Sequence, residues 1–371
     1  MAQATEDGQT ASPGVPDSGA PEPGTADPGT ADPGMGPRFG GESCWVDIDG
    51  PVHYLDFGGP AGAPVIVAVH GLEGCAVNWS ALAPLLTDRY QVLAPDLAGH
   101  GFTRSAGRGV DVSSNRVLLH RFIEAVAGSR VILMGNSMGG MIALSEAVAA
   151  PSTVTGLILL DPALPFMPVR PDPSVVMMFL VNMVPGLSQR MLRRRHQYAP
   201  EELVAGVLAT VCADPSRVPP AVVGQHVEVA RRRFGYTEAD REFTLASRSV
   251  VSAAGYITGG PYRRAINSVR CPVLMLHGTL DRLIPVATAR IVARAHPDWS
   301  LVVLPGVGHV PQLEAPLECA TEIREWLSPV GRGAALATAA TVATAATAAT
   351  APPAGPAAPS TGDDTTPAPR A

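Results

Sequence analysis

Short, continuous apolar runs are the feature of this sequence that most limits the folds open to it. The runs lie at 64–69, 91–95, 131–134, 156–160, 273–276 and 301–304. Apolar and polar side chains do not alternate within them, which indicates strands buried on both faces of a sheet. Helical patterns separate the runs. Strands that alternate with helices favour an α/β fold with a mostly parallel sheet and helices on both of its faces.

Two earlier segments have a different pattern. Residues 44–48 and 53–57 are joined by Asp49 and Gly50, a pair that is typical of the tight turn in a β-hairpin. We therefore expect these two segments to pair as antiparallel strands at one edge of the sheet.

The strongest signal for chemistry follows the run at 131–134. The sequence Gly-Asn-Ser-Met-Gly at 135–139 connects that run to a helical stretch of small residues at 140–149. A strand, a glycine-flanked serine and a helix in this order indicate a sharp turn that presents the serine hydroxyl above the edge of a sheet. A residue held at positive φ in so tight a turn needs neighbours without Cβ atoms. Ser137 is therefore the candidate nucleophile, and the alternative is an ordinary serine in a loop.

A serine hydroxyl is a weak nucleophile until an imidazole takes its proton, and the imidazole needs a carboxylate that fixes its tautomer. Both residue types follow apolar runs. Asp281 lies in the loop after the run at 273–276, and His309 follows the run at 301–304. We expect Asp281 to be the acid and His309 the base. Asp161, which ends another apolar run, is the rival acid.

Three further histidines stand beside glycines in expected loops. They are His70, His100 and His277. None of them follows the last apolar run, and we interpret them as structural hydrogen-bonding residues.

Acyl transfer also requires an oxyanion hole, because the oxygen of the tetrahedral intermediate needs donors where its charge develops. One donor is expected to be the amide of Met138, the residue after the nucleophile. The second is expected from the loop at 70–74, where two glycines allow close approach of the backbone. We assign it to the amide of Leu72.

At this point the sequence resembles the α/β-hydrolase superfamily over about residues 45–328. The matching pieces are His70-Gly71, the turn at 94–101, the serine elbow, the Asp281 loop and Gly308-His309. The resemblance implies an α/β-hydrolase fold with a mostly parallel eight-stranded sheet, and a helical cap inserted after strand 6. Together with the composition of the two ends, it gives five parts of the chain: a tail at 1–40, a first core part at 41–162, the cap at 163–265, a second core part at 266–329, and a tail at 330–371.

The expected cap is the part that would select the substrate. Residues 175–181 are apolar and have start and stop signals for one short helix. Met177 and Phe179 in this helix are candidate substrate-binding residues, because adaptable side chains suit an apolar ligand. Core packing within the cap is the alternative. The segment is too short to span a membrane, which takes about twenty residues.

Two arginine runs, 193–195 and 231–233, also fall in the expected cap. Three consecutive helical residues fan around the helix, so they cannot all face one site. We interpret the runs as solvated or ion-paired surface. The alternative is that one arginine meets a carboxylate of the substrate.

Composition sets the two ends apart from the rest. Residues 1–40 are rich in Pro, Gly, Ala, Thr and Asp and contain a five-residue repeat, and the chain from Gly333 on is mostly Ala, Thr and Pro. Such segments bury too little apolar area to offset the loss of chain entropy, so we expect both ends to be disordered. Removal of residues 1–40 and 333–371 should then leave activity and melting temperature nearly unchanged.

Charge and cysteine content narrow the classes of partner. The net charge is −6, but residues 43–329 carry 24 acids and 24 arginines. A neutral core offers no basic face for nucleic acid. The five cysteines show no C-x-x-C spacing, and no secretory signal or membrane span is recognisable, so we expect a cytoplasmic protein of unknown oligomeric state. Motifs for a metal or a nucleotide are missing, and we expect no cofactor.

Water is the default acceptor in acyl transfer by a serine, so the first hypothesis is a carboxylic ester hydrolase acting on an apolar small molecule. The elbow at 136–140 also resembles that of hydrolases that cleave carbon–carbon bonds in ring-fission diketones. Those enzymes commonly have a Gly- and Pro-containing loop after the first His-Gly and a Trp after the catalytic histidine. In this sequence Leu-Glu-Gly-Cys at 72–75 takes the place of that loop, and Val310 takes the place of the Trp. A noncatalytic receptor for small ligands on the same fold is a third hypothesis.

Overall fold

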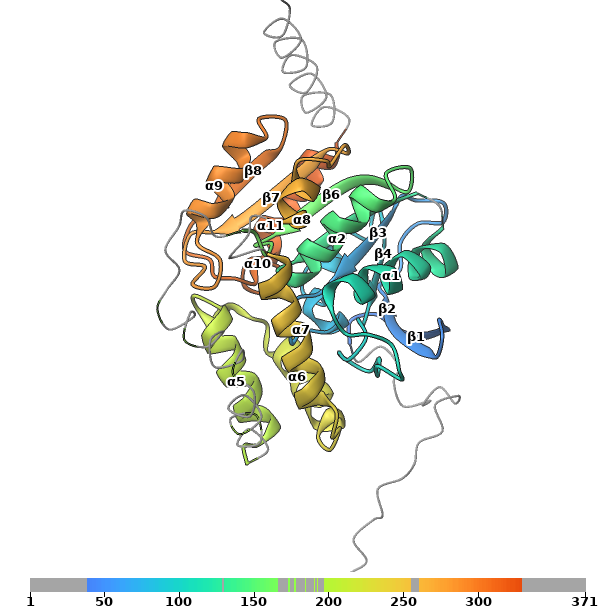
Figure 1. The fold of residues 1–371 in the computed structure, drawn as a ribbon, viewed down its shortest axis with the longest axis vertical. Coiled ribbons are helices and arrows are strands. Elements are labelled where there is room, and N and C mark those ends of the chain that lie inside the picture. Colours follow the sequence, from blue (N-terminus) through green and yellow to red (C-terminus); the bar gives the residue numbers. More distant parts are fainter. Residues whose placement is uncertain are drawn as a thin grey trace, which may run out of the picture.

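The computed structural model describes residues 39–128, 130–165, 197–254 and 260–328, together with Pro173, Met177, Val184, Arg190 and Leu192. Figure 1 shows a central sheet with helices packed around it and a group of helices at the lower end.

Eight strands form one sheet, in agreement with the sequence prediction. The strands are β1 (Glu42–Asp47), β2 (Pro51–Asp56), β3 (Val65–Val69), β4 (Gln91–Pro95), β5 (Val131–Asn136), β6 (Val154–Leu160), β7 (Val273–Gly278) and β8 (Ser300–Leu304). Their order is β1-β2-β4-β3-β5-β6-β7-β8. The first two strands form the expected antiparallel hairpin, and β3 to β8 pair in parallel. The carboxyl ends of β3 to β8 therefore meet at one edge of the sheet, and the site residues follow these ends.

The continuous apolar runs are explained by two hydrophobic cores, one on each face of the sheet. Strand β6 illustrates the alternation: Ile158 and Leu160 belong to one core, and Leu157 and Leu159 belong to the other. Because both faces are covered, every second residue stays buried and no polar position interrupts the run.

Helices cover both faces of the sheet. One face carries α1 (Val112–Phe122), α2 (Met138–Ala149) and α8 (Pro261–Ile266), with Ala289 of α9 (Val286–Ala295) in the same core. The other face carries the short helix at 76–79, together with α10 (Pro311–Glu314) and α11 (Pro316–Leu327). The sheet is therefore the middle layer of three, as expected.

Four described helices lie between β6 and β7, where the cap was expected. They are α5 (Pro200–Val211), α6 (Pro220–Arg233), α7 (Ala239–Ala253) and α8. Helices α5 and α6 lie side by side at the lower end of the molecule in Figure 1. Helix α7 packs on α1, and Ala246 and Val250 of α7 belong to the core that also holds α1 and α2. Only part of this insertion therefore extends away from the core.

The first described residue, Phe39, falls inside the segment 1–40 that composition assigns to a tail. Its side chain is only 1% exposed. The ring packs edge-on against Phe102 with 6.1 Å between ring centroids, and Ser80 Oγ donates a hydrogen bond to the Phe39 carbonyl at 2.6 Å. Packed structure therefore begins no later than Phe39, and the expected boundary after residue 40 is corrected on this point.

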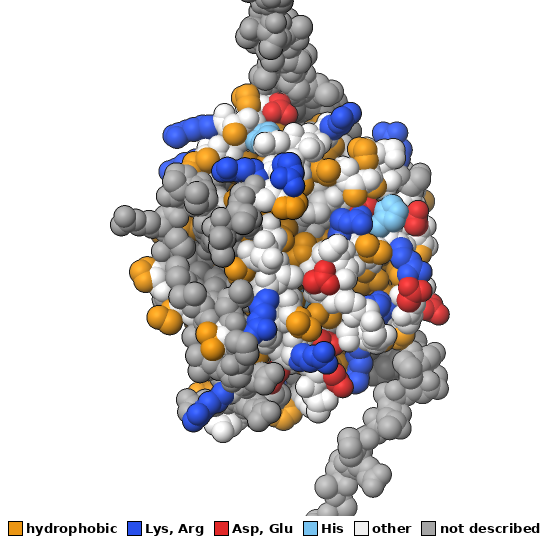
Figure 2. Space-filling model, in the orientation of Figure 1, with side chains coloured by type: hydrophobic (Ala, Val, Ile, Leu, Met, Phe, Trp, Pro, Cys, Tyr) orange, Lys and Arg blue, Asp and Glu red, His pale blue; other side chains and the backbone are white. Residues whose placement is uncertain are grey.

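Basic side chains are spread over the face drawn in Figure 2, and acidic ones lie mainly on its right-hand and lower parts. Over residues 43–329 as a whole, acids and arginines are equal in number. Within the described residues, no helix combines the length and the apolar character that crossing a membrane requires.

Candidate functional site

Ser137 occupies the sharp turn that the sequence predicts. Strand β5 ends at Asn136, helix α2 begins at Met138, and Ser137 between them has φ 53° and ψ −118°. Few residues other than glycine adopt this conformation, because it is strained. Strained backbone of this kind is common at functional sites. A Cβ atom on Gly139 would lie 2.1 Å from the carbonyl oxygen of Val69, so only glycine allows the turn to pass this close to β3.

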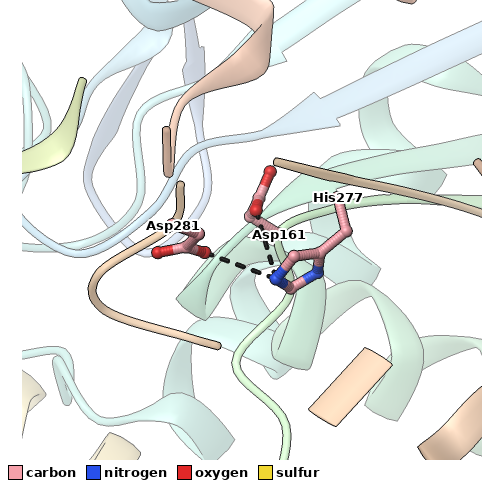
Figure 3. Close-up of side chains that lie close together, drawn as sticks. All are labelled: Asp161, His277 and Asp281. Carbon is pink, nitrogen blue, oxygen red and sulfur yellow. Dashed lines mark ion pairs between the residues drawn. The ribbon is translucent and has the colours of Figure 1, made fainter. Parts of the chain in front are cut away.

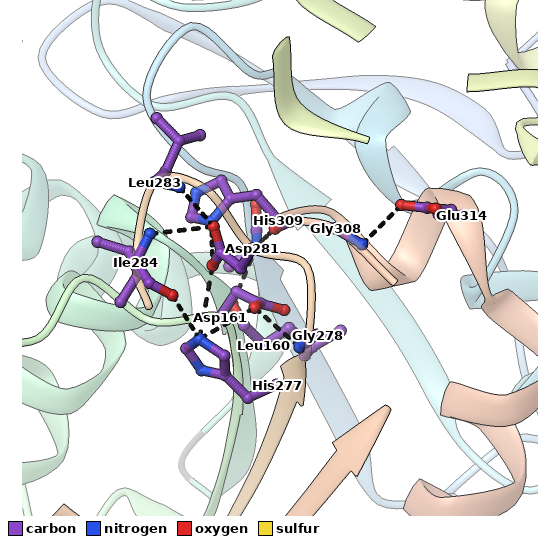
Figure 4. Close-up of polar contacts among 11 residues, drawn as sticks. Leu160, Asp161, His277, Gly278, Asp281, Leu283, Ile284, Gly308, His309 and Glu314 are labelled. Carbon is purple, nitrogen blue, oxygen red and sulfur yellow. Dashed lines mark hydrogen bonds and ion pairs between the residues drawn. The ribbon is translucent and has the colours of Figure 1, made fainter. Parts of the chain in front are cut away.

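Asp281 and His309 meet directly. The Nδ1 atom of His309 lies 2.8 Å from Asp281 Oδ2, and both side chains are buried. The other oxygen, Asp281 Oδ1, accepts hydrogen bonds from the amides of Leu283 and Ile284 (Figure 4). Burial alone would raise the pKa of Asp281, but the adjacent His309 lowers it below the usual 3.8. Asp281 is therefore a carboxylate that holds the His309 ring in one orientation.

The Ser137 turn and the His309 loop are tied together through Asn136. The Asn136 amide group donates hydrogen bonds to the carbonyls of Leu160 and His309, both at 3.0 Å. Ser137 and His309 also line the same pocket. No hydrogen bond joins Ser137 Oγ to His309 in the described part of the chain. In substrate-free enzymes such bonds are often long and tighten only when substrate binds.

The loop at 70–74 runs beside the serine, as the oxyanion-hole prediction requires. A Cβ atom on Gly71 would lie 3.1 Å from Ser137 Cβ, so the loop and the serine are in close contact. Leu72 comes next and lines the pocket, and its amide donates none of the hydrogen bonds found among the described loops. The amide of Met138 begins α2 and has no partner within that helix. Both amides are available as donors beside Ser137.

His70 ties this loop to the segment after β4 through both of its ring nitrogens. Its Nδ1–H donates to the Gly71 carbonyl at 2.8 Å, and its Nε2 accepts from the Leu97 amide at 3.1 Å. Burial lowers the pKa of His70, and burial lowers the pKa of His100 to about 3. Both rings therefore stay neutral, in agreement with their expected structural role.

A pocket of about 270 Å³ opens above Ser137 and His309. Its core side is formed by the loops at 71–75, 99–101 and 309–310. Its other side is formed by residues of α5, α6 and the first turns of α7, most of them Val, Leu or Ala. The site is thus a largely apolar cavity between the sheet edge and the helices inserted after β6.

Neither of the two residues proposed for substrate binding is among the described residues that line the pocket. Met177 is 60% exposed. Phe179 lies outside the described residues. The described pocket wall comes instead from α5, α6 and α7, and of its residues on these helices the sequence analysis singled out only Arg233.

A strained serine elbow, a buried acid–histidine pair and an apolar pocket together are the arrangement of one large enzyme family, and the family model for the alpha/beta hydrolases matches residues 66–322. The chain belongs to the alpha/beta hydrolase family. The fold and the family predicted from the sequence are thus confirmed.

Relatives of this alpha/beta hydrolase include more than one activity. A pimeloyl-[acyl-carrier protein] methyl ester esterase of Aromatoleum aromaticum is 27% identical over 71% of this chain and 97% of its own length. A 2-hydroxy-6-oxo-6-(2'-aminophenyl)hexa-2,4-dienoic acid hydrolase of Metapseudomonas resinovorans is 26% identical over 74% of this chain and 87% of its own. The solved 2-hydroxy-6-oxo-6-phenylhexa-2,4-dienoate hydrolase of a Rhodococcus strain has a TM-score of 0.58 at 24% identity, covering 74% of this chain and 94% of its own.

In this alpha/beta hydrolase the rival acid, Asp161, lies next to Asp281 but does not bind His309. Its Oδ1 accepts the Gly278 amide at 3.0 Å, and its buried carboxyl group also shares a side-chain hydrogen bond with Asp281. Burial first, and then the negative charge of Asp281, raise the pKa of Asp161 well above 3.8. Asp161 is therefore a neutral carboxylic acid beside a charged carboxylate.

Asp161, His277 and Asp281 form a cluster with the residue types of a metal site (Figure 3). His277 Nε2 lies 3.3 Å from Asp161 Oδ1 and 3.5 Å from Asp281 Oδ2. The same Nε2 is 2.8 Å from the Ile284 carbonyl, which can only accept, so Nε2 carries a proton and has no lone pair for a metal. Asp281 already accepts hydrogen bonds on both of its oxygens. The donor set fits a hydrogen-bonded cluster better than a metal centre.

Glu314 is a buried residue of the site that the sequence analysis did not single out. It accepts hydrogen bonds from the amides of Ala213 and Asp214, which follow α5, and from the amide of Gly308 beside the histidine, at 2.9–3.0 Å. Figure 4 shows the bond to Gly308. The His309 amide also donates to the Val211 carbonyl at 2.7 Å. The inserted helices are therefore bonded directly to the histidine loop.

The second arginine run separates into two roles. Arg231 pairs with Glu201 and Glu228, and Arg232 pairs with Glu228, as expected for ion-paired surface. Arg233 lines the pocket and donates hydrogen bonds to the carbonyls of Gly99 and Gly101. The run at 193–195 lies outside the described residues.

Proposed function

We propose that this alpha/beta hydrolase cleaves carboxylic esters of apolar small molecules through an acyl-enzyme on Ser137. The observation that carries the proposal is the 2.8 Å contact between Asp281 and His309, made at the same pocket as the strained turn of Ser137. The esterase among the relatives supports the reaction type. The Val, Leu and Ala side chains of the pocket support an apolar substrate.

In the proposed mechanism, Ser137 Oγ attacks the ester carbonyl carbon while His309 Nε2 takes the hydroxyl proton. The carbonyl oxygen becomes an oxyanion and accepts hydrogen bonds from the amides of Leu72 and Met138. The bond to the alcohol oxygen then breaks, and His309 gives its proton to the departing alcohol. A water molecule, deprotonated by His309, attacks the acyl carbon, and Ser137 leaves with the proton returned to it.

Asp281 has two tasks in this scheme. It keeps the proton of neutral His309 on Nδ1, so that Nε2 presents a lone pair to the serine. It also stabilises the imidazolium that forms in each half-reaction. Its own hydrogen bonds from Leu283 and Ile284 hold it in place while it does so.

Cleavage of a carbon–carbon bond in a ring-fission diketone acid is the second candidate. The relative of Metapseudomonas resinovorans and the guanidinium of Arg233 in the pocket wall favour it, because a guanidinium pairs with a substrate carboxylate. The Arg233 guanidinium already donates hydrogen bonds to the carbonyls of Gly99 and Gly101, and most lining residues of α5 and α6 are hydrocarbon. We therefore place ester hydrolysis first.

A substrate panel tests these alternatives. Purified protein is given p-nitrophenyl esters of increasing chain length and a ring-fission diketone, and is labelled in parallel with a fluorophosphonate probe. We expect ester turnover, labelling of Ser137, and a loss of about 10⁶-fold in turnover in Ser137→Ala. A loss below tenfold would reject Ser137 as the nucleophile. Turnover of the diketone alone would select the second candidate, and labelling without turnover of any compound would favour a receptor.

A further inference from the structure

Two polar side chains interrupt the apolar wall that α6 presents to the pocket, and within the described part of the chain only one of them has a partner on the core. Four residues of α6 line the cavity: His226, Val229, Ala230 and Arg233. Their spacing of three, four and seven residues places them on one face of the helix. Arg233 is bonded to two carbonyls of the core, as described above. His226 has no such contact with the core among the described residues.

The hydrogen bond of His226 within its own helix fixes where its proton lies. Nδ1 is 2.9 Å from the Val222 carbonyl, one turn earlier in α6. A carbonyl oxygen can only accept, so Nδ1 carries the proton, and in the neutral ring Nε2 holds a lone pair. Burial lowers the pKa of His226 below 6.5, which keeps the ring neutral at neutral pH. His226 therefore offers a hydrogen-bond acceptor and no second donor.

This acceptor is buried without a partner. His226 Nε2 has no hydrogen bond among the described residues. A buried polar atom left unpaired destabilises the protein, and most such atoms in folded proteins are paired. The lining residues of α5, such as Leu208, and Val229 and Ala230 of α6 have only hydrocarbon side chains to offer, and Arg233 already donates to carbonyls of the core. A bound molecule in the pocket would supply the donor that the protein does not.

We propose that His226 Nε2 is a specificity contact that accepts a hydrogen bond from a neutral hydroxyl or N–H group on the substrate. The inference rests on the proposed ester hydrolysis and narrows it to apolar substrates that carry one such donor. A neutral donor fits better than an ammonium group at this position, because a charge is costly to remove from water and the lining residues of α5 are all hydrocarbon. The acidic lining residues Glu73 and Asp240 belong to other elements of the pocket. The contact determines which substrate is preferred and takes no part in bond cleavage.

The experiment uses pairs of p-nitrophenyl esters with equal numbers of heavy atoms. One member of each pair ends in a hydroxyl group and the other in a methyl group, over acyl chains of four to ten carbons. An apolar pocket without an acceptor favours the methyl ester at every length. We expect the wild-type protein to favour the hydroxyl ester at one or two lengths, by about tenfold or more in kcat/KM.

Two variants separate the acceptor from the shape of the side chain. His226→Leu removes the acceptor, and we expect the ratio of hydroxyl to methyl ester to fall at least tenfold. His226→Gln keeps a carbonyl oxygen at a comparable reach, and we expect it to retain most of the preference. A wild-type protein that favours the methyl ester at every length would overturn the inference, and so would an unchanged ratio in folded His226→Leu protein.

A binding measurement keeps this test separate from that of the proposed function. The same ester pairs are titrated into Ser137→Ala protein by calorimetry, which needs no turnover. Tighter binding of a hydroxyl ester, abolished by adding His226→Leu, supports the contact even if the wild-type protein hydrolyses none of the esters. Equal affinity within every pair rejects the contact even if ester hydrolysis is confirmed.

Discussion

At the scale of single residues, the contact with His309 is what distinguishes Asp281 from Asp161, and we expect it to decide which of the two is the catalytic acid. Asp281 Oδ1 accepts two backbone amides, and Oδ2 binds His309. In Asp281→Asn the remaining oxygen keeps the two amides, so the new NH₂ group faces His309 Nδ1. The ring is then forced into the tautomer with its proton on Nε2, which cannot accept the serine proton. We expect turnover to fall by about 10⁴-fold.

The matched variant is Asp161→Asn. The substituted side chain would keep an oxygen for the Gly278 amide, and Asp161 makes no hydrogen bond to His309 in the described structure. Turnover should stay within a few-fold of wild type in steady-state assays at pH 7. If Asp161→Asn loses turnover and Asp281→Asn keeps it, the roles assigned to the two acids must be exchanged.

Asp161 also predicts a pH dependence of stability. Its pKa is raised in the folded protein, first by burial and then by the charge of Asp281. A raised carboxyl pKa contributes stability that is complete below the unfolded pKa near 3.8 and is lost as pH rises toward the folded pKa. An asparagine side chain at this position does not titrate. The free energy of unfolding of Asp161→Asn relative to wild type should therefore increase with pH above pH 4, by about 1.4 kcal/mol per pH unit until the folded pKa is reached, and level off beyond it. Urea unfolding at pH 5, 6 and 7 measures it, and a constant difference would contradict it.

Residues whose role depends on their position at a strand end could be predicted from the sequence. The Asp281–His309 contact is of this kind, because each residue follows an apolar run and parallel strands end at one edge. Glu314 and His226 could not be predicted in this way. The partners of Glu314 include amides about 100 residues away, and the importance of His226 comes from a missing partner. The one available signal for Glu314 was its place five residues after His309 in an otherwise apolar stretch.

At the scale of elements, the segment after α5 and the histidine loop form one hydrogen-bonded unit through Glu314. In Glu314→Gln one carboxylate oxygen becomes an NH₂ group that faces a backbone N–H, so at least one amide loses its acceptor. Unfolding free energy should fall by about 1–3 kcal/mol. We also expect kcat to fall about tenfold with less change in KM, because the histidine loop loses its anchor and the apolar wall remains.

Hydrogen exchange provides the local measurement for this variant. The amides of Ala213, Asp214 and Gly308 should exchange faster in Glu314→Gln than in wild type, since each donates to Glu314. Glu318→Gln, an exposed residue of the neighbouring helix α11, is the control and should change neither exchange nor kcat. Faster exchange at Gly308 with an unaltered kcat would argue against a positioning role of Glu314.

The elements themselves were predictable to different degrees. Six continuous apolar runs and one Asp-Gly turn correspond to the eight strands, because burial on both faces leaves a strong pattern. The pocket wall was not predictable, since its residues on α5 and α6 have the 3.6-residue pattern of any amphipathic helix. That pattern indicates a buried face without saying whether the face meets a core or a cavity.

At the scale of the whole molecule, the fold depends on a residue that composition assigns to the tail. The ring of Phe39 is 1% exposed and packs on Phe102. Loss of a buried aromatic side chain costs about 3 kcal/mol or more. For a domain of this size we expect a melting temperature lower by roughly 6–12 °C when residues 1–40 are removed. Phe39→Ala in the full chain should reproduce most of that decrease.

The matched truncation removes residues 1–38 and keeps Phe39. The removed segment is rich in proline and has few large apolar residues, and the first 42 positions hold seven acids. This composition predicts that the truncated protein melts within about 1–2 °C of wild type. Both truncations should keep kcat, because Phe39 is not among the described residues that line the pocket. Scanning calorimetry of the two proteins side by side measures the difference. Equal melting temperatures would mean that Phe39 contributes no stability, whereas an equal decrease in both would assign a structural role to residues before it.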